Sequence, residues 1–251
     1  MIRLLVAMLL WAVPAGAEQI VSGLSESRVS INANFDGTAI LIYGAAMREA
    51  PPPDWPLLQV IVTVEGPSAP LVVRQKERVA GIWLNRGAVR VDSAPSFYAV
   101  ATTGDLGDIL SKTDDLRYRI SIPYAIHAIG ISSEAPDAPS YIEALQRIRM
   151  AEDNYRLSAN SVLLLQQSLF RTDVVLPANL IEGKYKVRIF LTRGGKVVDS
   201  QESQIDVRKA GLERFLFSLA QNQPLLYGVV SLLMATLAGL GASEVFRRLR
   251  L

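Results

Sequence analysis

The chain has 251 residues, of which 50% are hydrophobic and 20% are charged, and its formal net charge is only +2. This charge balance does not provide the basic surface that nucleic-acid-binding domains need. The chain has no cysteine and a single histidine, so neither a disulfide framework nor a thiolate or imidazole metal centre is expected.

Residues 1–17 predict a secretory signal peptide. Arg3 gives a basic start, an apolar stretch of about ten residues follows it, and Ala15-Gly16-Ala17 has the A-x-A pattern of a cleavage site. About ten apolar residues are too few to cross a bilayer as a helix. We therefore expect cleavage after Ala17 and export of the residues that follow. An uncleaved N-terminal anchor is the alternative.

Residues 18–103 predict a first β-sandwich unit. In "VSINANF" apolar and polar residues alternate, and Asp36-Gly37 is typical of a tight hairpin turn into the strand "TAILIYGA". Five further strands are expected in "LLQVIVTVEG", "LVVRQKE", "GIWLN", "AVRVD" and "SFYAVA". Short strands separated by turn residues favour an antiparallel, immunoglobulin-like sandwich. We expect Trp83 to be a core anchor between its sheets, with ligand stacking as the alternative.

Residues 104–158 predict a mixed, partly helical insertion. The segment "GDLGDILSK" indicates a short helix. A second helix is expected over about 140–157, because Ser140 and Glu143 have the spacing of a capping box. His127 lies in the apolar stretch "YAIHAIG", where a structural role is favoured over a catalytic one.

Residues 159–208 predict a second β unit. In "KYKVRIFL" apolar and basic residues alternate, and Gly194-Gly195 indicates a two-residue turn into the next strand. The basic residues of this hairpin form a candidate anion patch, with a solvated strand face as the alternative: Lys184, Lys186, Arg188, Arg193 and Lys196. The fold class is therefore mainly β with an inserted helical segment. Two linked β units are favoured over one sandwich with an insertion.

Residues 209–223 predict a juxtamembrane amphipathic helix. Leu212, Phe215, Leu216 and Leu219 have the i, i+3, i+4, i+7 spacing of one apolar helix face. This helix is expected either at the outer lipid interface or packed against the exported domain.

Residues 224–246 predict a transmembrane helix. The run is predominantly apolar with Glu244 as its single charged residue, and at about 1.5 Å per residue it can cross a hydrocarbon core of about 30 Å. Residues 247–251 form a basic tail with Arg247, Arg248 and Arg250, which predicts a cytoplasmic C-terminus and a periplasmic ectodomain.

Small residues recur every three or four positions within the predicted span. This spacing places them on one helix face, as in helices that pack closely in membranes. The candidate helix–helix interface consists of Gly228, Ser231, Ala235, Gly239 and Ser243. The alternative is that these residues are common in any membrane helix.

Three stretches of the chain resemble one known family. They are "RQKERVAGIWLNRGAVRV" with "PSFYAVAT", "SLFRTDVVLPANLIEGKYKVRIFL", and "ERFLFSLAQNQPLLYG". The family consists of alphaproteobacterial transmembrane proteins with a signal peptide, an ectodomain and a C-terminal anchor. It has no established activity and no assigned site residues. The resemblance implies a partner, because the family's genes are said to lie beside a multi-helix exporter of sulfite or organosulfonates.

No enzymatic motif stands out in the chain. It has no G-x-S-x-G elbow, phosphate-binding loop or dinucleotide fingerprint, so we expect no catalytic, cofactor-binding or metal-binding residues. The expected protein is a single-pass inner-membrane protein whose periplasmic domain is a non-enzymatic accessory subunit, with the exporter as a candidate partner. The alternative is a membrane-tethered module that binds or senses a small anion. Expected partners are the bilayer and, through the span, a transporter or a second copy.

Overall fold

The computed structural model describes residues 18–32, 35–49, 51, 55–126, 138–209 and 219–249. Twelve strands lie in these ranges: β1 (Gln19–Leu24), β2 (Arg28–Ile31), β3 (Thr38–Met47), β4 (Leu58–Glu65), β5 (Ser68–Val79), β6 (Ile82–Pro95), β7 (Tyr98–Thr102), β8 (Tyr155–Ser158), β9 (Leu163–Leu165), β10 (Leu169–Leu176), β11 (Gly183–Arg193) and β12 (Lys196–Lys209). Five helices accompany them: α2 (Leu106–Ile109), α3 (Lys112–Tyr118), α4 (Ile122–Ala125), α6 (Ala138–Ala151) and α8 (Pro224–Leu249). The expectation of a mainly β protein with a C-terminal apolar helix is confirmed.

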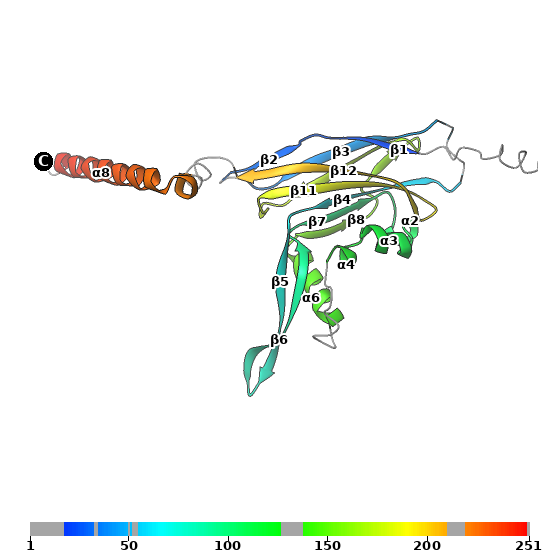
Figure 1. Cartoon of the computed structure of the whole chain (residues 1–251), viewed down its shortest axis with the longest axis horizontal. Coiled ribbons are helices and arrows are strands. Elements are labelled where there is room, and N and C mark those ends of the chain that lie inside the picture. Colours follow the sequence, from blue (N-terminus) through cyan, green and yellow to red (C-terminus); the bar gives the residue numbers. More distant parts are fainter. Residues whose placement is uncertain are drawn as a thin grey trace, which may run out of the picture. The chain divides into compact units, whose positions relative to one another are not determined.

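The strands form two sheets and a separate hairpin (Figure 1). Sheet A has the order β1-β3-β10-β9, and sheet B has the order β2-β12-β11-β4-β7-β8. Among the described strands, β5 and β6 pair only with each other, and we call this hairpin the arm. Pairing is antiparallel where β3 meets β1 and β10, whereas β7 and β8 run parallel. The immunoglobulin-like detail of the expectation stays a prediction.

The main core lies between the two sheets. Strand β10 shows how the sequence specifies it, because its residues alternate strictly between exposed and buried positions. Strand β4 is buried on both faces, which explains why apolar residues occupy the consecutive positions 60–62. Val60 and Val62 are fully buried on one face, and Ile61 packs on the opposite side. Sheet B is therefore covered on both faces at β4.

The two expected β units are not separate in the structure. Sheet A pairs β3 with β10, and sheet B pairs β4 with β11, so each sheet combines strands from residues 18–103 and 159–208. This interleaving corresponds to one sandwich with a helical insertion, the alternative that was not favoured.

The expected hairpin around Asp36-Gly37 is wrong. Strand β2 lies beside β12 in sheet B, and β3 belongs to sheet A. Both edges of β3 are occupied by β1 and β10, which leaves no edge for β2. Gly37, with φ of +111°, instead sits in a connection that passes from one sheet to the other.

The helices and the root of the arm cover the outer face of sheet B. A second apolar cluster there joins Tyr98 and Phe190 of the sheet to Leu110, Ile120 and Leu145 of the insertion. The Tyr98 hydroxyl donates a hydrogen bond of 2.7 Å to the Ile120 carbonyl. The insertion is therefore part of the folded domain.

Helix α6 differs from its prediction at both ends. It begins at Ala138, so Ser140 lies inside the first turn and is not the N-cap. The ring of Pro139 favours a first helical turn at this point. The helix ends at Ala151, and Tyr155, which lies within the expected helix range of about 140–157, is a buried residue of β8.

The sandwich, the insertion and the arm belong to one compact unit, and α8 belongs to a second one. Within α8, Pro224–Ser243 has a mean hydropathy of 1.9 and is long enough to cross a membrane. The signal peptide with Ala17, His127, Arg250 and most of the expected amphipathic helix lie outside the described residues.

Candidate functional site

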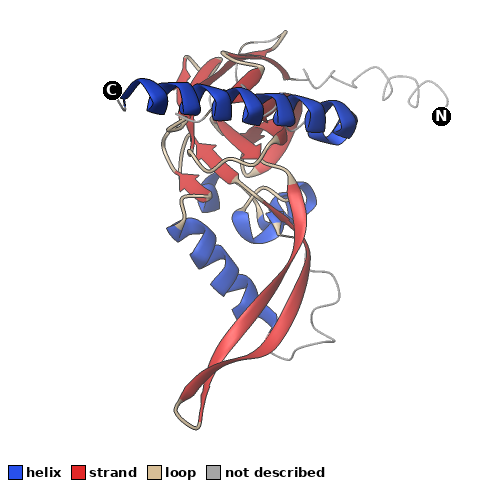
Figure 2. Cartoon of the chain, turned by 90° about the vertical axis from the view of Figure 1, so that its left-hand side faces the viewer, coloured by secondary structure: helices blue, strands red, loops and turns tan. Residues whose placement is uncertain are grey.

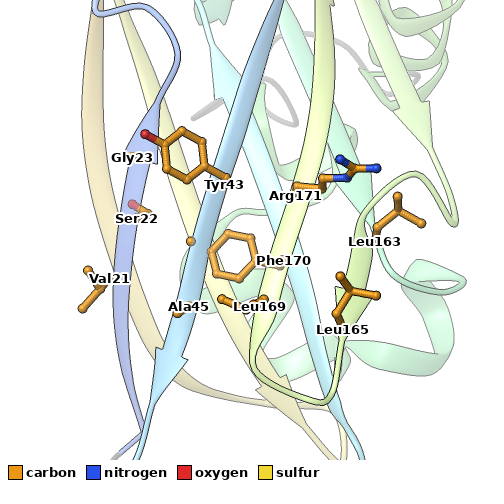
Figure 3. Close-up of a pocket in the computed structure, with 11 residues that line it drawn as sticks. Val21, Ser22, Gly23, Tyr43, Ala45, Leu163, Leu165, Leu169, Phe170 and Arg171 are labelled. Atoms are coloured by element: carbon orange, nitrogen blue, oxygen red, sulfur yellow. The ribbon is translucent and has the colours of Figure 1, made fainter.

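An apolar groove runs over the outer face of sheet A (Figure 3). Its volume is about 550 Å³, and all four strands of the sheet contribute to it. The side chains that define it are Val21, Tyr43, Ala45, Leu163, Leu165 and Leu169. We call this surface the groove face.

Strand register brings these residues together from distant parts of the chain. Alternate residues of a strand point outward, and cross-strand partners lie side by side. One row across the sheet is Val21, Ala45, Leu169 and Leu165, and the next is Gly23, Tyr43, Arg171 and Leu163. Seven of these eight residues are apolar or glycine, so the groove face is apolar over both rows except at Arg171.

Small residues hollow the centre of the groove face. Ala45 leaves a gap between the longer side chains of Val21 and Leu169. The ring of Tyr43 lies across Gly23, where an added Cβ would stand 2.8 Å from the Tyr43 Cζ atom. A groove of this depth therefore depends on glycine and alanine at these positions.

The apolar residues of the groove face are unusually accessible. Leu165 is 60% exposed, Leu169 is 56% exposed and Val21 is 55% exposed. Soluble monomers rarely expose a contiguous apolar area of this kind unless it binds something. The groove face has Arg171 as its charged lining residue and no paired nucleophile and base, so its chemistry is that of binding.

Sequence reasoning missed the groove face. Its signal is the run Leu163-Leu164-Leu165 in β9, where apolar residues occupy both faces of a strand that needs only one buried face. The remaining residues could not be grouped without the strand order.

The candidate anion patch is only partly assembled. Lys184, Lys186 and Arg188 share one face of β11 by alternation. A carboxylate residue stands opposite each of them across the ladder: Asp206 opposite Lys184, Glu65 opposite Lys186, and Glu202 opposite Arg188. The local field on this face is therefore mixed, and its role in anion binding stays a prediction.

Two arginines of that candidate patch hold the fold together. Arg188 donates to the Tyr118 carbonyl at 2.7 Å and to the Tyr98 hydroxyl oxygen at 3.1 Å. Arg193 forms an ion pair with Glu18 at 2.6 Å, and both side chains are nearly buried. These guanidinium groups are already used by structural acceptors.

The buried tyrosines are neutral hydrogen-bond donors. Burial raises the pKa of Tyr155 to about 12, and its hydroxyl donates to the Pro95 carbonyl at 2.8 Å. Burial also raises the pKa of Tyr98, although the neighbouring Arg188 guanidinium acts in the opposite direction. Neither group can act as a base near neutral pH.

Asp114 and Asp115, in the segment "TDD", accept hydrogen bonds from backbone N–H groups. Asp115 accepts from the Ser121 backbone N–H at 2.8 Å, and Asp114 accepts from the Val197 backbone N–H at 2.8 Å. Among the described residues there is no group of three or more His, Cys, Asp or Glu side chains that could hold a metal ion.

The expectation that Trp83 is a core anchor is wrong. Trp83 lies beside the turn of the arm and is 65% exposed. The three segments "LVVRQKE", "GIWLN" and "AVRVD" are not separate sandwich strands, because they merge into the arm. A bulge at Gly87, with φ of +71°, allows β6 to keep pairing with β5 through the point where "GIWLN" and "AVRVD" were expected to be separate strands.

The small residues of α8 face open space. A Cβ added at Gly228 or Gly239 would meet nothing within 4 Å. Ala235 and Ser243 are exposed, and Ser231 is half-buried. The small-residue face is therefore accessible to a neighbouring helix, although its role stays a prediction.

Comparison with known proteins gives one family and one weak structural similarity. The chain is similar to Spo0M, a sporulation control protein from Bacillus subtilis, with 9% identity and a TM-score of 0.28. That match covers 82% of this chain and 56% of the other protein, and a similarity of this size carries no functional argument. The comparison with curated proteins found no match. Residues 19–248 match the family described as "Putative transmembrane protein (Alph_Pro_TM)", and the chain belongs to this family.

Proposed function

We propose that this protein is a single-pass inner-membrane protein whose periplasmic β-sandwich binds a partner through the groove face, without catalysing a reaction. Family membership and α8 support the membrane anchor. The cleavage pattern at residues 15–17 and the arginines after the span support the orientation, with the C-terminus in the cytoplasm.

The exposed groove face carries this proposal. Its leucines lie on the outer side of sheet A, so the sandwich core does not need them. Covering a leucine that is half exposed contributes about 1 kcal/mol, and several such residues together can support association. Small residues at the centre of the groove face provide a recess into which a partner's apolar side chain fits.

The partner that we propose is a multi-helix transporter for sulfite or an organosulfonate. This choice is supported by the family resemblance and by a span that could bring the ectodomain beside a polytopic protein. The small-residue face of α8 would supply the contact inside the membrane, and the groove face would supply the contact outside it.

Affinity purification from native membranes tests the proposal. We expect the wild-type protein to retain a stoichiometric polytopic partner, and Leu165→Asp to lose most of it. Leu116→Asp is the matched control, because Leu116 is 61% exposed on α3, away from sheet A. Equal recovery of the partner by both variants would refute the role of the groove face.

A reporter fusion tests the orientation. A reporter that is active only in the periplasm should work after Arg208 and fail after Leu251. An active C-terminal fusion would overturn the orientation.

A further inference from the structure

The arm projects beyond the rest of the folded domain (Figure 2). Helix α6 runs beside its root, where Val73 and Val89 are buried. The Tyr141 hydroxyl of α6 donates to the Gln75 side-chain oxygen at 3.1 Å, and the same hydroxyl lies against Gly87. Beyond these contacts, no described side chain in residues 76–86 is buried.

The end of the arm carries exposed apolar side chains. Ile82 and Trp83 are each 65% exposed, and Leu84 is 46% exposed. At about 3.4 Å per residue, five residues per strand extend the turn roughly 17 Å past the last contact with α6. We call residues 82–84 the tip.

Cations line the arm below the tip. Arg74, Lys76 and Arg78 alternate along β5, so their side chains leave the same face, and all three are exposed. Trp83 stands opposite Arg78 in the ladder. Residues 74–90 contain five basic residues and one acidic residue, whereas the whole chain is nearly balanced.

We propose that the tip inserts into the interface of the bilayer that anchors the chain, while the cations of β5 bind its anionic headgroups. Tryptophan favours the headgroup level of a bilayer, and each Lys or Arg near an anionic surface adds to binding. A chain that is already anchored by α8 holds the tip near that bilayer at a high effective concentration. This inference does not depend on the groove face.

The chemistry of the arm favours lipid over a protein partner. Three apolar side chains provide too little area for a stable protein interface, which buries about 1,200–2,000 Å² in total. Lysine is also depleted from the centre of protein interfaces. A lipid surface needs only a few inserted apolar residues with cations beside them.

Site-specific fluorescence on the full chain tests the proposal. Because the chain has no cysteine, Trp83→Cys provides a single attachment site for an environment-sensitive dye. The labelled protein is reconstituted into vesicles of phosphatidylcholine with or without phosphatidylglycerol. A dye at Leu116→Cys, an exposed position on α3, is the matched control.

We expect the dye at position 83 to shift its emission to the blue and to be quenched by doxyl-labelled lipid when phosphatidylglycerol is present. The dye at position 116 should show neither effect. Replacing Arg74, Lys76 and Arg78 by Gln should lower the ratio of inserted to free tip by on the order of a hundredfold.

Two results would overturn the proposal. In the first, the dye at position 83 remains as water-exposed as the control in anionic vesicles. In the second, its emission shifts to the blue without quenching by doxyl lipid, which means that protein covers the tip. Circular dichroism of the Gln variant checks that the loss does not come from unfolding.

Discussion

The protein contains two long hairpins, of which one lies within a sheet and the other does not. The hairpin β11–β12 is built into sheet B, whereas the arm leaves the sandwich. Both turn at residues with positive φ, and both carry basic residues at alternate positions. In β11 the positions between the basic residues are Tyr185, Val187 and Ile189, which are buried. In the outer half of β5 those positions include Gln75, so the arm has no continuous apolar face.

This difference shows what decides whether a hairpin joins a sheet. Strand propensity and a good turn are enough to form a hairpin next to a folded domain. Only an apolar face along the whole strand gives the free energy to bury it, at about 25 cal/mol per Å² of apolar area. The root of the arm has such a face and is buried, and the outer half lacks it and projects.

An aspartate introduced into each hairpin should give the largest difference in the free energy of unfolding. Val187→Asp buries an unpaired carboxylate in sheet B and should cost at least about 4 kcal/mol of unfolding free energy, enough to prevent folding. Trp83→Asp, at an exposed position, should change that free energy in detergent by no more than about 0.5 kcal/mol. Urea unfolding followed by circular dichroism measures both. Equal losses would show that the arm is part of the core.

Alkaline pH should weaken the sandwich rather than the arm. Burial raises the pKa of Tyr155 to about 12 and also raises the pKa of Tyr185 above 10. Stability should therefore be complete below pH 10 and fall as pH rises through the raised pKa values, because the unfolded chain then loses these protons more readily. For Tyr155 the loss reaches about 3 kcal/mol.

Tyr155→Phe should flatten this pH dependence relative to wild type in urea titrations between pH 8 and about 11.5. The variant loses the hydrogen bond to Pro95, so the slope with pH is the informative quantity rather than the stability at pH 8. An unchanged slope would contradict the assignment to Tyr155.

Alanine substitutions at two glycines of the arm should lower the free energy of unfolding by different, smaller amounts. Gly87→Ala places a Cβ against the Tyr141 hydroxyl in a backbone with φ of +71°, and should cost about 2 kcal/mol. Gly81→Ala has a similar φ of +86° but nothing within 4 Å, and should cost only about 1 kcal/mol.

A double-mutant cycle isolates the contact from the backbone strain. Tyr141→Phe removes the hydroxyl but leaves the Cζ atom, which an alanine Cβ at position 87 would approach at 3.7 Å. Gly87→Ala should therefore cost less in the Tyr141→Phe background than in the wild type, as measured by urea unfolding. Additive effects would mean that Tyr141 does not brace the arm at this point.

The local sequence predicted the elements whose pattern is complete within one segment. The β11–β12 turn at Gly194-Gly195 is confirmed. A two-residue hairpin turn favours positive φ, which glycine adopts readily, and alternating strands flank the two glycines. Strand β4 lies within the expected strand "LLQVIVTVEG". The apolar helix α8 follows from length and composition.

Tertiary structure alone decided the pairing between segments. The alternation in β2 and β3 predicts two strands but does not determine which strands they pair with. In the structure β3 pairs with β1 on one edge and with β10 on the other. Trp83 has the residue type of a core anchor, and it is exposed because the outer half of the arm pairs only with itself and no described side chain of residues 76–86 is buried. The groove face needs register across four strands that come from residues 19–47 and 163–176. Alternation and turn chemistry act over a few residues, whereas sheet partners are chosen by the total area that the whole chain can bury.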